Sequence, residues 1–344
     1  MGLPDASDSR LADLTRWVFD DLGFAGSQIA PASVDASFRR YFRVTRGEDS
    51  YIVMDAPPEK ESLGPFLSVA KLLLGMGLNA PVVLAKDPQH NLLLLSDLKQ
   101  QQYLDELVTD DAADRLYADA LGALCTMQTS GNGAARDLPR YSHDLLRREM
   151  ELMPEWFLLR HLGLQTSAAE RSMLDRLFET LAQSALAQPA AFVHRDYHSR
   201  NLLVTADNNP GILDFQDAVW GPVTYDLVSL LKDCYVAWPA PRVSAWALQY
   251  RERLLAAGFP VGLPEAEFIR GFDLVGLQRH IKVLGIFSRL YYRDGKAQYL
   301  RDLPRVLRYT RDAAAAYAET AEFAEFIAKR VAPEFLAAQE RVLA

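Results

Sequence analysis

Residues 192–226 read FVHRDYHSRNLLVTADNNPGILDFQDAVWGPVTYD, and this stretch decides how the rest of the chain is interpreted. Two short β-type runs, 202–204 and 211–213, lie on either side of a polar turn. Runs of this kind joined by turn residues predict a β-hairpin. The hairpin would bring Asn201, which precedes it, and Asp214, which follows it, to the same end.

The residue types in this stretch suit phosphoryl transfer. That chemistry needs positioning, a metal that neutralises phosphate charge, and a group that accepts or orients the proton of the nucleophile. Asp196 is the predicted catalytic residue and would face the attacking hydroxyl. Asn201 and Asp214 would hold Mg²⁺ against the phosphates of ATP. A single loop aspartate is usually a turn former or cap, but a chance match would lack the hairpin between the two metal ligands.

The remaining sequence predicts an α+β fold with two lobes. The chain has 344 residues, 49% of them hydrophobic, which is enough for two ordinary cores. Hydrophobic periodicity and turn residues predict a small antiparallel β lobe over 1–97 and a larger, mainly helical lobe over 98–344. The elements expected in the first lobe are a helix over 9–22, strands over 36–44, 50–55, 81–85 and 91–95, and a helix over 66–74. Helices are expected over 111–128, 142–160 and 168–187, after 226, and in the Ala-rich tail 313–344.

Charge and targeting signals exclude several classes of protein. The net charge of -8 argues against a nucleic-acid partner bound through a basic surface. The acidic N-terminus lacks the apolar core of a signal peptide, and no run approaches the length of a membrane span. Cys125 and Cys234 fit no metal spacing and are expected to be buried thiols. A cytoplasmic monomer without a membrane partner is expected.

The motif residues carry a resemblance to a known superfamily. Residues 194–201, followed by 213–215, are similar to the protein-kinase-like superfamily, in its branch of aminoglycoside phosphotransferases and choline kinases. Gln216 stands where protein kinases have Gly, which favours that branch. The resemblance implies a bilobal protein-kinase-like fold. It also implies that Asp226 braces the catalytic loop, although a plain acid at a helix N-terminus is an equal alternative.

A closer resemblance covers most of the chain. Residues 38–43, 54–59, 193–201, 214–218 and 278–285 resemble the anomeric amino-sugar kinases of bacterial cell-wall recycling. The resemblance implies phosphorylation of the C1 hydroxyl of N-acetylmuramic acid and N-acetylglucosamine. The alternatives are an aminoglycoside or choline kinase and, in another class, an inactive kinase-like binding module. The last is suggested by missing parts of the nucleotide site.

The nucleotide site lacks its usual signature. No Gly-rich loop precedes the first hairpin, and the strand over 50–55 ends in Asp55 instead of a phosphate-binding Lys. Arginine grips phosphate through two hydrogen bonds, so arginines of the first hairpin are the expected replacement. Strand alternation puts Arg39 and Arg43 on one face and Arg40 on the other. The predicted nucleotide-binding residues are Ser37, Arg39, Arg40, Arg43 and Leu98, with Lys60 and Lys71 as weaker alternatives and solvated surface arginines as the competing interpretation.

The sugar site is expected near the metal and in the helical lobe. Arg279 and Lys282 are three residues apart, so they lie near one face of a helix, and a lactyl carboxylate would need such a cation. Tyr235 and Trp238 could stack on a sugar ring, although aromatic residues at helix ends are more often core. His198 is expected to be structural. The predicted substrate-binding residues are Gln216, Asp217, Arg279, Lys282, Tyr235 and Trp238.

Overall fold

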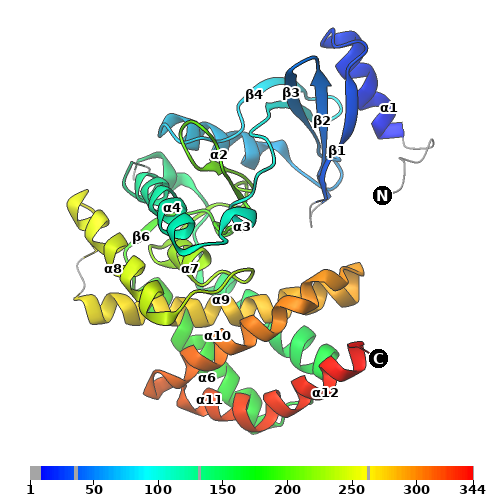
Figure 1. Ribbon diagram of the computed structural model, residues 1–344. Coiled ribbons are helices and arrows are strands. Elements are labelled where there is room, and N and C mark those ends of the chain that lie inside the picture. Colours follow the sequence, from blue (N-terminus) through cyan, green and yellow to red (C-terminus); the bar gives the residue numbers. More distant parts are fainter. Residues whose placement is uncertain (1–8, 35–37, 131–132, 262–263, 344) are drawn as a thin grey trace. The chain divides into compact units, whose positions relative to one another are not determined.

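The protein is known from a computed structural model that describes residues 9–34, 38–130, 133–261 and 264–343 (Figure 1). Contacts divide the chain into two compact units. The first unit consists of Met1–Gln102 and Leu202–Asp217, and the second of Tyr103–Asn201 and Ala218–Ala344. This division differs from the boundary predicted after Asp97, because the segment after Asn201 is bridged to Asn79 and Gln102 of the first unit.

The first unit is built on a five-stranded antiparallel sheet. The predicted strands are all present, and an additional edge strand precedes them. In spatial order the strands are β1 (Gln28–Val34), β2 (Arg40–Arg46), β3 (Asp49–Asp55), β5 (Leu92–Ser96) and β4 (Val83–Asp87). β2 and β3 form the predicted hairpin, with Arg40 opposite Asp55. Gly47 lies in its tight turn with φ +61°, a conformation that suits glycine.

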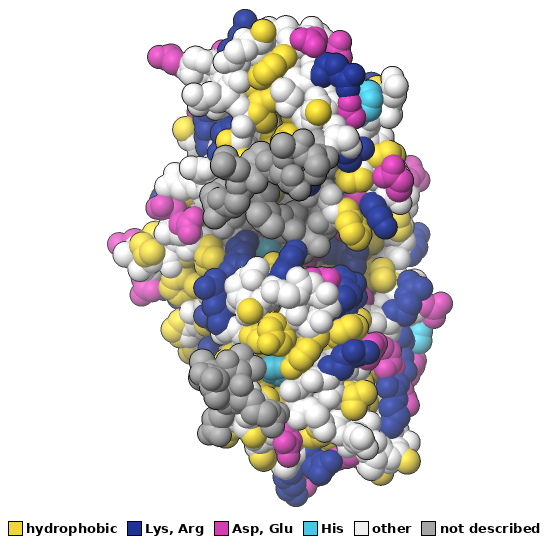
Figure 2. Space-filling view, turned by 90° about the vertical axis from the view of Figure 1, so that its right-hand side faces the viewer, with side chains coloured by type: hydrophobic (Ala, Val, Ile, Leu, Met, Phe, Trp, Pro, Cys, Tyr) yellow, Lys and Arg dark blue, Asp and Glu magenta, His cyan; other side chains and the backbone are white. Residues whose placement is uncertain are grey.

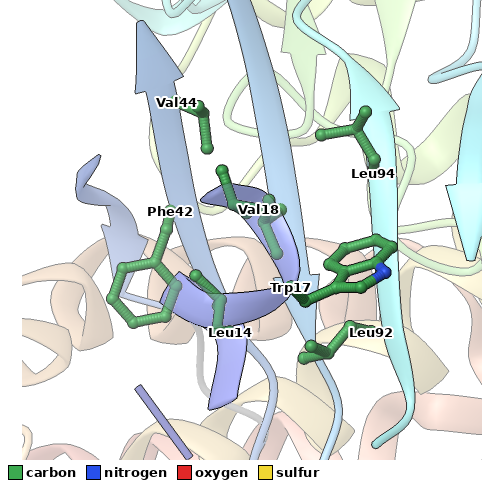
Figure 3. Close-up of a cluster of buried hydrophobic side chains, with 8 residues drawn as sticks. Leu14, Trp17, Val18, Phe42, Val44, Leu92 and Leu94 are labelled. Carbon is green, nitrogen blue, oxygen red and sulfur yellow. The ribbon is translucent and has the colours of Figure 1, made fainter. Parts of the chain in front are cut away.

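One face of this sheet is covered by the N-terminal helix. The helix predicted over 9–22 is α1 (Ser9–Arg16), continued by a π-helical turn, Trp17–Asp21. Figure 3 shows the apolar side chains of this helix against those of the strands. The buried cluster comprises Leu14, Trp17 and Val18 of the helix and Phe42, Val44, Val53, Leu92 and Leu94 of the sheet. Its strand residues alternate along β2, so their neighbours Tyr41 and Arg43 lie on the opposite face.

The predicted hairpin after the catalytic loop belongs to the first unit. It pairs β7 (Leu202–Leu203) with β8 (Gly211–Ile212) in an antiparallel register. Bridges from Asn79 to Gly211 and from Gln102 to Leu203 attach the hairpin to the rest of the unit. The helix α2 (Leu63–Gly75) contributes Phe66, whose ring lies 4.9 Å from that of Phe215. These contacts fix the position of Asp214 within the first unit.

The second unit is mainly helical, as predicted. Its α-helices are α3 (Tyr103–Glu106), α4 (Asp110–Ser130), α5 (His143–Met150), α6 (Ala168–Leu186), α7 (Tyr225–Leu231), α8 (Ala240–Ala256), α9 (Glu265–Asp294), α10 (Leu303–Ala315), α11 (Ala321–Phe326) and α12 (Ala332–Leu343). π-Helical segments cover Met153–Leu162 and Ile327–Val331, and 3₁₀ turns cover Ala134–Asp137, Ala297–Asp302 and Ala318–Thr320. A two-stranded antiparallel sheet joins β6 (Ala190–Val193) to β9 (Val219–Pro222).

The long helix α9 forms the centre of this unit. It packs against α6, α7, α10 and the π-helical segment after α5. Gly285 allows the closest of these approaches, because a Cβ atom there would lie 2.3 Å from the backbone carbon of Leu152. The middle of α9 therefore runs through the core, and its polar side chains there, Arg279 and Lys282, are buried.

The surface carries charged side chains of both signs, mixed with apolar ones (Figure 2). On the face shown in Figure 2, Lys and Arg side chains alternate with Asp, Glu and apolar ones. Among the described residues, no helix is long and apolar enough to cross a bilayer. Cys234 is buried and Cys125 is half-buried, and burial raises the pKa of both thiols.

Candidate active site

The predicted catalytic loop follows β6, and a buried carboxylate holds its first residues. Asp226, at the start of α7, accepts hydrogen bonds from the backbone N–H groups of His194 (2.6 Å) and Arg195 (3.0 Å). Arg195 has φ +77°, a left-handed conformation that is strained for a residue other than glycine. The two hydrogen bonds stabilise this conformation. Asp226 is fully buried and braces the loop, so its role extends beyond that of a helix-start acid.

A second buried carboxylate holds the other end of the loop. Asp233 accepts a hydrogen bond from the backbone N–H of Ser199 (2.9 Å) and another from the N–H of Tyr235 (2.9 Å). Between the two ends, the side chain of Asn201 donates to the carbonyl oxygen of Asp196 (3.0 Å). Sequence reasoning did not identify Asp233. Its only signal is that it follows Asp226 by seven residues, or about two helical turns.

The carboxylate of Asp196 lies in a positive environment. Burial raises its pKa, but the charges of Lys282, His198, Arg279 and Arg195 lower it by more, to about 2. Asp196 is therefore an anion at neutral pH. An ionised carboxylate can accept the hydrogen bond of an acceptor hydroxyl, as the predicted catalytic role requires.

The predicted metal ligands carry oxygen donors of the kind that Mg²⁺ prefers. Because the Nδ2 group of Asn201 donates to the loop, its Oδ1 atom points away from that carbonyl. Asp214, at φ +61° just after β8, accepts a 2.7 Å hydrogen bond from Gln216 on one carboxylate oxygen. No cluster of three or more His, Cys, Asp or Glu side chains suited to a metal occurs in the described ranges. The chemistry of each side chain fits Mg²⁺, and their joint use as metal ligands stays a prediction, since Asn201 belongs to the second unit and Asp214 to the first.

The two cations predicted to bind sugar have partners inside the second unit. Arg279 donates to the Ser229 hydroxyl (2.7 Å) and to the Cys234 sulfur (3.5 Å). Lys282 forms an ion pair with Glu149 (2.9 Å) and donates to the Tyr225 hydroxyl (3.1 Å). Both side chains are buried. These contacts hold both side chains in the core of the second unit. Their positive charges lower the pKa of Asp196.

The other predicted sugar contacts lie in different surroundings. Trp238 is half-buried; it donates to the Tyr117 hydroxyl (2.9 Å) and packs edge-on against Tyr117 and Trp246. Tyr235 is half-buried, and the guanidinium of Arg200 lies 3.7 Å from its ring centre. Gln216 is buried and bonds Asp214, whereas Asp217 is exposed.

His198 lies two residues after Asp196 in the loop. Its backbone N–H donates to the Asp196 carbonyl (3.1 Å), and its ring packs edge-on against Tyr235. Burial lowers the pKa of His198. These contacts agree with the structural role expected from the sequence.

The arginines of the first hairpin separate by face. Arg40 and Arg10 of α1 both bind the buried carboxylate of Asp55, so Arg40 lies on the face that α1 covers. On the other face, Arg39 pairs with Glu61 (2.9 Å) just before α2, and Arg43 pairs with Asp97 (2.7 Å). The contacts give Arg40 a role in holding α1, and Arg39 and Arg43 each pair with a different carboxylate, so their nucleotide role stays a prediction.

The other predicted nucleotide contacts are less informative. Leu98 packs against Gly211, where its Cδ1 atom would lie 3.1 Å from an added Cβ. Ser37 lies outside the described residues. Lys60 lies 5.4 Å from the ring centre of the exposed Phe38.

Comparison with known proteins places these features in a family. Residues 28–268 match the phosphotransferase enzyme family. Three curated relatives are named N-acetylmuramate/N-acetylglucosamine kinase. The Pseudomonas aeruginosa protein is 48% identical (88% of each chain covered), the Pseudomonas putida protein 45% (94% of this chain, 97% of the relative) and the Neisseria meningitidis protein 42% (89% and 91%).

Solved structures share the fold at low sequence identity. A Plasmodium vivax ethanolamine kinase has a TM-score of 0.62 at 10% identity, with 92% of this chain and 91% of that chain covered. A GDP complex of an aminoglycoside phosphotransferase has a TM-score of 0.60 at 16% identity, with 88% and 97% covered. These matches confirm the predicted protein-kinase-like fold. The chain belongs to the phosphotransferase enzyme family, in the group whose curated members are named N-acetylmuramate/N-acetylglucosamine kinases.

Proposed function

We propose that this protein transfers the γ-phosphoryl group of ATP to the C1 hydroxyl of N-acetylmuramic acid and N-acetylglucosamine, as a cytoplasmic step of peptidoglycan recycling. The choice of sugar rests on the 42–48% sequence identity to three kinases named for these sugars, over most of the chain. The braced catalytic loop supports the transfer itself. Its central carboxylate is ionised, and its backbone is held by hydrogen bonds to Asp226.

Asp196 is proposed to orient the acceptor more than to act as a strong base. A group with a pKa of about 2 takes up a proton poorly at neutral pH. An anomeric hydroxyl is more acidic than an ordinary alcohol, and phosphoryl transfer passes through a loose transition state that needs little early deprotonation. Asp196 would therefore hold the C1 hydroxyl by a charge-assisted hydrogen bond and direct its oxygen at the γ-phosphorus.

Asn201 and Asp214 are the proposed ligands of Mg²⁺. The ion, when bound, would neutralise charge on the transferred phosphoryl group. The chain's contribution is the orientation of both ligands. The hydrogen bond to the Asp196 carbonyl orients the Asn201 amide, and the Gln216 amide fixes the carboxylate of Asp214. Gln216 is therefore proposed to support the metal site instead of touching the sugar.

Asp217 and Tyr235 are the proposed sugar contacts best supported by exposure. Asp217 is exposed and could accept hydrogen bonds from sugar hydroxyls. Tyr235, with Arg200 over its ring, could present an aromatic face and a cation near a lactyl carboxylate. Arg279 and Lys282 are proposed to act on Asp196, because anionic ligands would have to compete with their internal partners.

The sugar assignment is tested by product formation with a panel of acceptors. The purified protein is incubated with γ-labelled ATP, Mg²⁺ and, separately, N-acetylmuramic acid, N-acetylglucosamine, glucose, choline and an aminoglycoside. Label is expected in the products of the two amino sugars only. Transfer to choline or the aminoglycoside alone would support the alternative kinase. Absence of transfer to every acceptor would support an inactive binding module.

Arg39→Ala is expected to raise the apparent KM for ATP by about tenfold, since a charged hydrogen bond to phosphate contributes roughly 1.5–3 kcal/mol. Arg40→Ala is the matched control. It removes one of two guanidinium partners of the buried Asp55, so it should lower Tm while leaving the KM unchanged. Steady-state kinetics and thermal melts of both variants check this. An unchanged KM in Arg39→Ala would exclude Arg39 as a phosphate contact.

A further inference from the structure

A buried group of charged and phenolic side chains lies behind the catalytic loop. We call it the Glu149 cluster; it consists of Glu149, Arg195, Lys282, Tyr141 and Tyr225. Oε1 of Glu149 accepts from Arg195 (2.5 Å) and Lys282 (2.9 Å), and Oε2 accepts from the Tyr141 hydroxyl. Lys282 also donates to the Tyr225 hydroxyl. One carboxylate thus joins the loop, the centre of α9 and the segment before α5.

The cluster is tightly enclosed. Glu149 and Lys282 are each 7% exposed, and Tyr141 and Tyr225 are buried with their ring centres 5.1 Å apart. Tyr141 also lies against the backbone of Gly221, where a Cβ atom would come within 2.7 Å of its Cβ. Glu149 therefore has a fixed position, and Arg195 and Lys282 are held relative to it.

All three charged members are ionised at neutral pH. Burial raises the pKa of Glu149, but Lys282 and Arg195 lower it by more. Burial lowers the pKa values of Arg195 and Lys282, and Glu149 raises both above their ordinary range. Within the cluster two cations face one anion, and the charge of Asp196 lies near both cations. Removing several charges from water is costly and does not by itself stabilise a fold, so this arrangement calls for another role.

The cluster acts on the catalytic residue in two ways. Arg195 precedes Asp196 in the chain, and Glu149 fixes its side chain while Asp226 fixes its strained backbone. The groups that face Asp196 are Lys282 and Arg279 of α9, Arg195 and His198 of the loop, and Asp226 of α7. The loop geometry and the charge behind Asp196 thus both depend on one buried carboxylate.

We propose that Glu149 is a positioning residue for phosphoryl transfer, because it holds Arg195 and Lys282 where they align the catalytic loop and surround Asp196 with positive charge. This inference rests on the assignment of Asp196 as the catalytic residue. Glu149 touches neither substrate nor metal in this account. It acts through the two cations that it binds.

The test compares Glu149→Gln with the neutral pair Glu149→Gln/Lys282→Gln. In Glu149→Gln, the buried Lys282 and the half-buried Arg195 lose their counter-ion, so Tm falls and kcat is expected to fall about 10–100-fold. In the neutral pair, Tm should recover toward wild type. Its kcat should stay at least tenfold low, with the ATP KM changed less than threefold.

Glu151→Gln is the matched control. Glu151 follows Glu149 by two residues and also lies between two arginines, Arg171 (2.5 Å) and Arg147 (3.5 Å), but at the surface. Its substitution should leave kcat unchanged. If neither cluster variant folds, Tyr141→Phe is measured instead. This change removes one hydrogen bond from Glu149 and no charge. Its kcat is expected to fall three- to tenfold.

A neutral pair with wild-type kcat would overturn the proposal and leave the cluster a purely structural role. So would a folded Glu149→Gln or Tyr141→Phe with unchanged kcat. The wild-type protein is assayed first with both amino sugars. If the wild type phosphorylates neither sugar, the proposed function is wrong. If the wild type is active and the variants keep its full kcat, the proposed role of Glu149 is wrong.

Discussion

Asp196→Asn is expected to lower kcat by about 10³-fold, within the range of roughly 10²–10⁴ for a positioned acid–base group. The amide keeps the shape of the carboxylate but not its negative charge, so the acceptor hydroxyl loses its charge-assisted hydrogen bond. Binding of ATP and Mg²⁺ should remain, because the proposed metal ligands Asn201 and Asp214 are unchanged. The loss should therefore appear in kcat, with the KM for ATP changed only a few-fold.

Single-turnover kinetics and magnesium-dependent thermal stabilisation by ATP separate these effects. Asp207→Asn is the control, since Asp207 is an exposed aspartate in the turn of the same motif. It should behave as wild type. An Asp196→Asn variant with more than a tenth of the wild-type kcat would contradict a catalytic role for Asp196.

The pKa of Asp196 gives this prediction a pH dependence. Its folded pKa of about 2 lies below the ordinary value, so the stability it contributes is present above about pH 4 and is lost as pH falls through 2. Asp196 should thus cause no acid limb in the wild-type kcat profile above about pH 4. If the wild-type kcat profile has an acid limb above pH 5 and Asp196→Asn lacks this limb, the assignment of Asp196 as an anion at that pH is wrong.

Asp226→Asn is expected to lower kcat by at least 10²-fold, the second largest effect. An amide has one acceptor oxygen, whereas the Asp226 carboxylate accepts from the N–H groups of both His194 and Arg195. One buried N–H would lose its partner at a cost of about 1–3 kcal/mol. The left-handed conformation of Arg195 would lose its support, and Asp196 would move out of line with the acceptor.

The control for this change is Asp312→Asn at an exposed pair with Arg311, which should alter neither Tm nor kcat. Thermal melts report the folded fraction, and kcat is corrected for it. If Asp226→Asn lowered Tm while the folded fraction kept its full kcat, the brace would serve stability alone. Backbone amide exchange at His194 and Arg195 gives a second measure, because both groups should lose protection in the variant.

Local patterns predicted much of the fold and the catalytic loop. The hairpin with Asn201 and Asp214 at its ends, the β2–β3 hairpin and the helical remainder follow from strong turn and periodicity signals. The strand β1 was missed because Pro31 and a bulge interrupt its pattern. The attachment of segment 202–217 to the first unit was also missed, because it depends on bridges between residues far apart in sequence.

The residues that support the site needed tertiary information. Glu149 and Asp233 are ordinary acids near helix ends in the sequence, and only folding brings them to the catalytic loop. Strand alternation separated Arg40 from Arg43, in agreement with their different partners, Asp55 and Asp97. It could not tell which face α1 covers, and this decides that Arg40 binds Asp55 beside Arg10. Lys282 and Arg279 were placed near one helix face, but their burial could not be inferred from spacing.

The position of the phosphate on the product tests the central claim most directly. The protein is incubated with ATP, Mg²⁺ and N-acetylmuramic acid or N-acetylglucosamine, and the sugar phosphate is examined by ³¹P–¹H correlation NMR. The account predicts that phosphorus couples to the anomeric proton H1 and that the product has no reducing end. Coupling to the protons at C6, or an absence of sugar phosphate when ATP is bound, would contradict it.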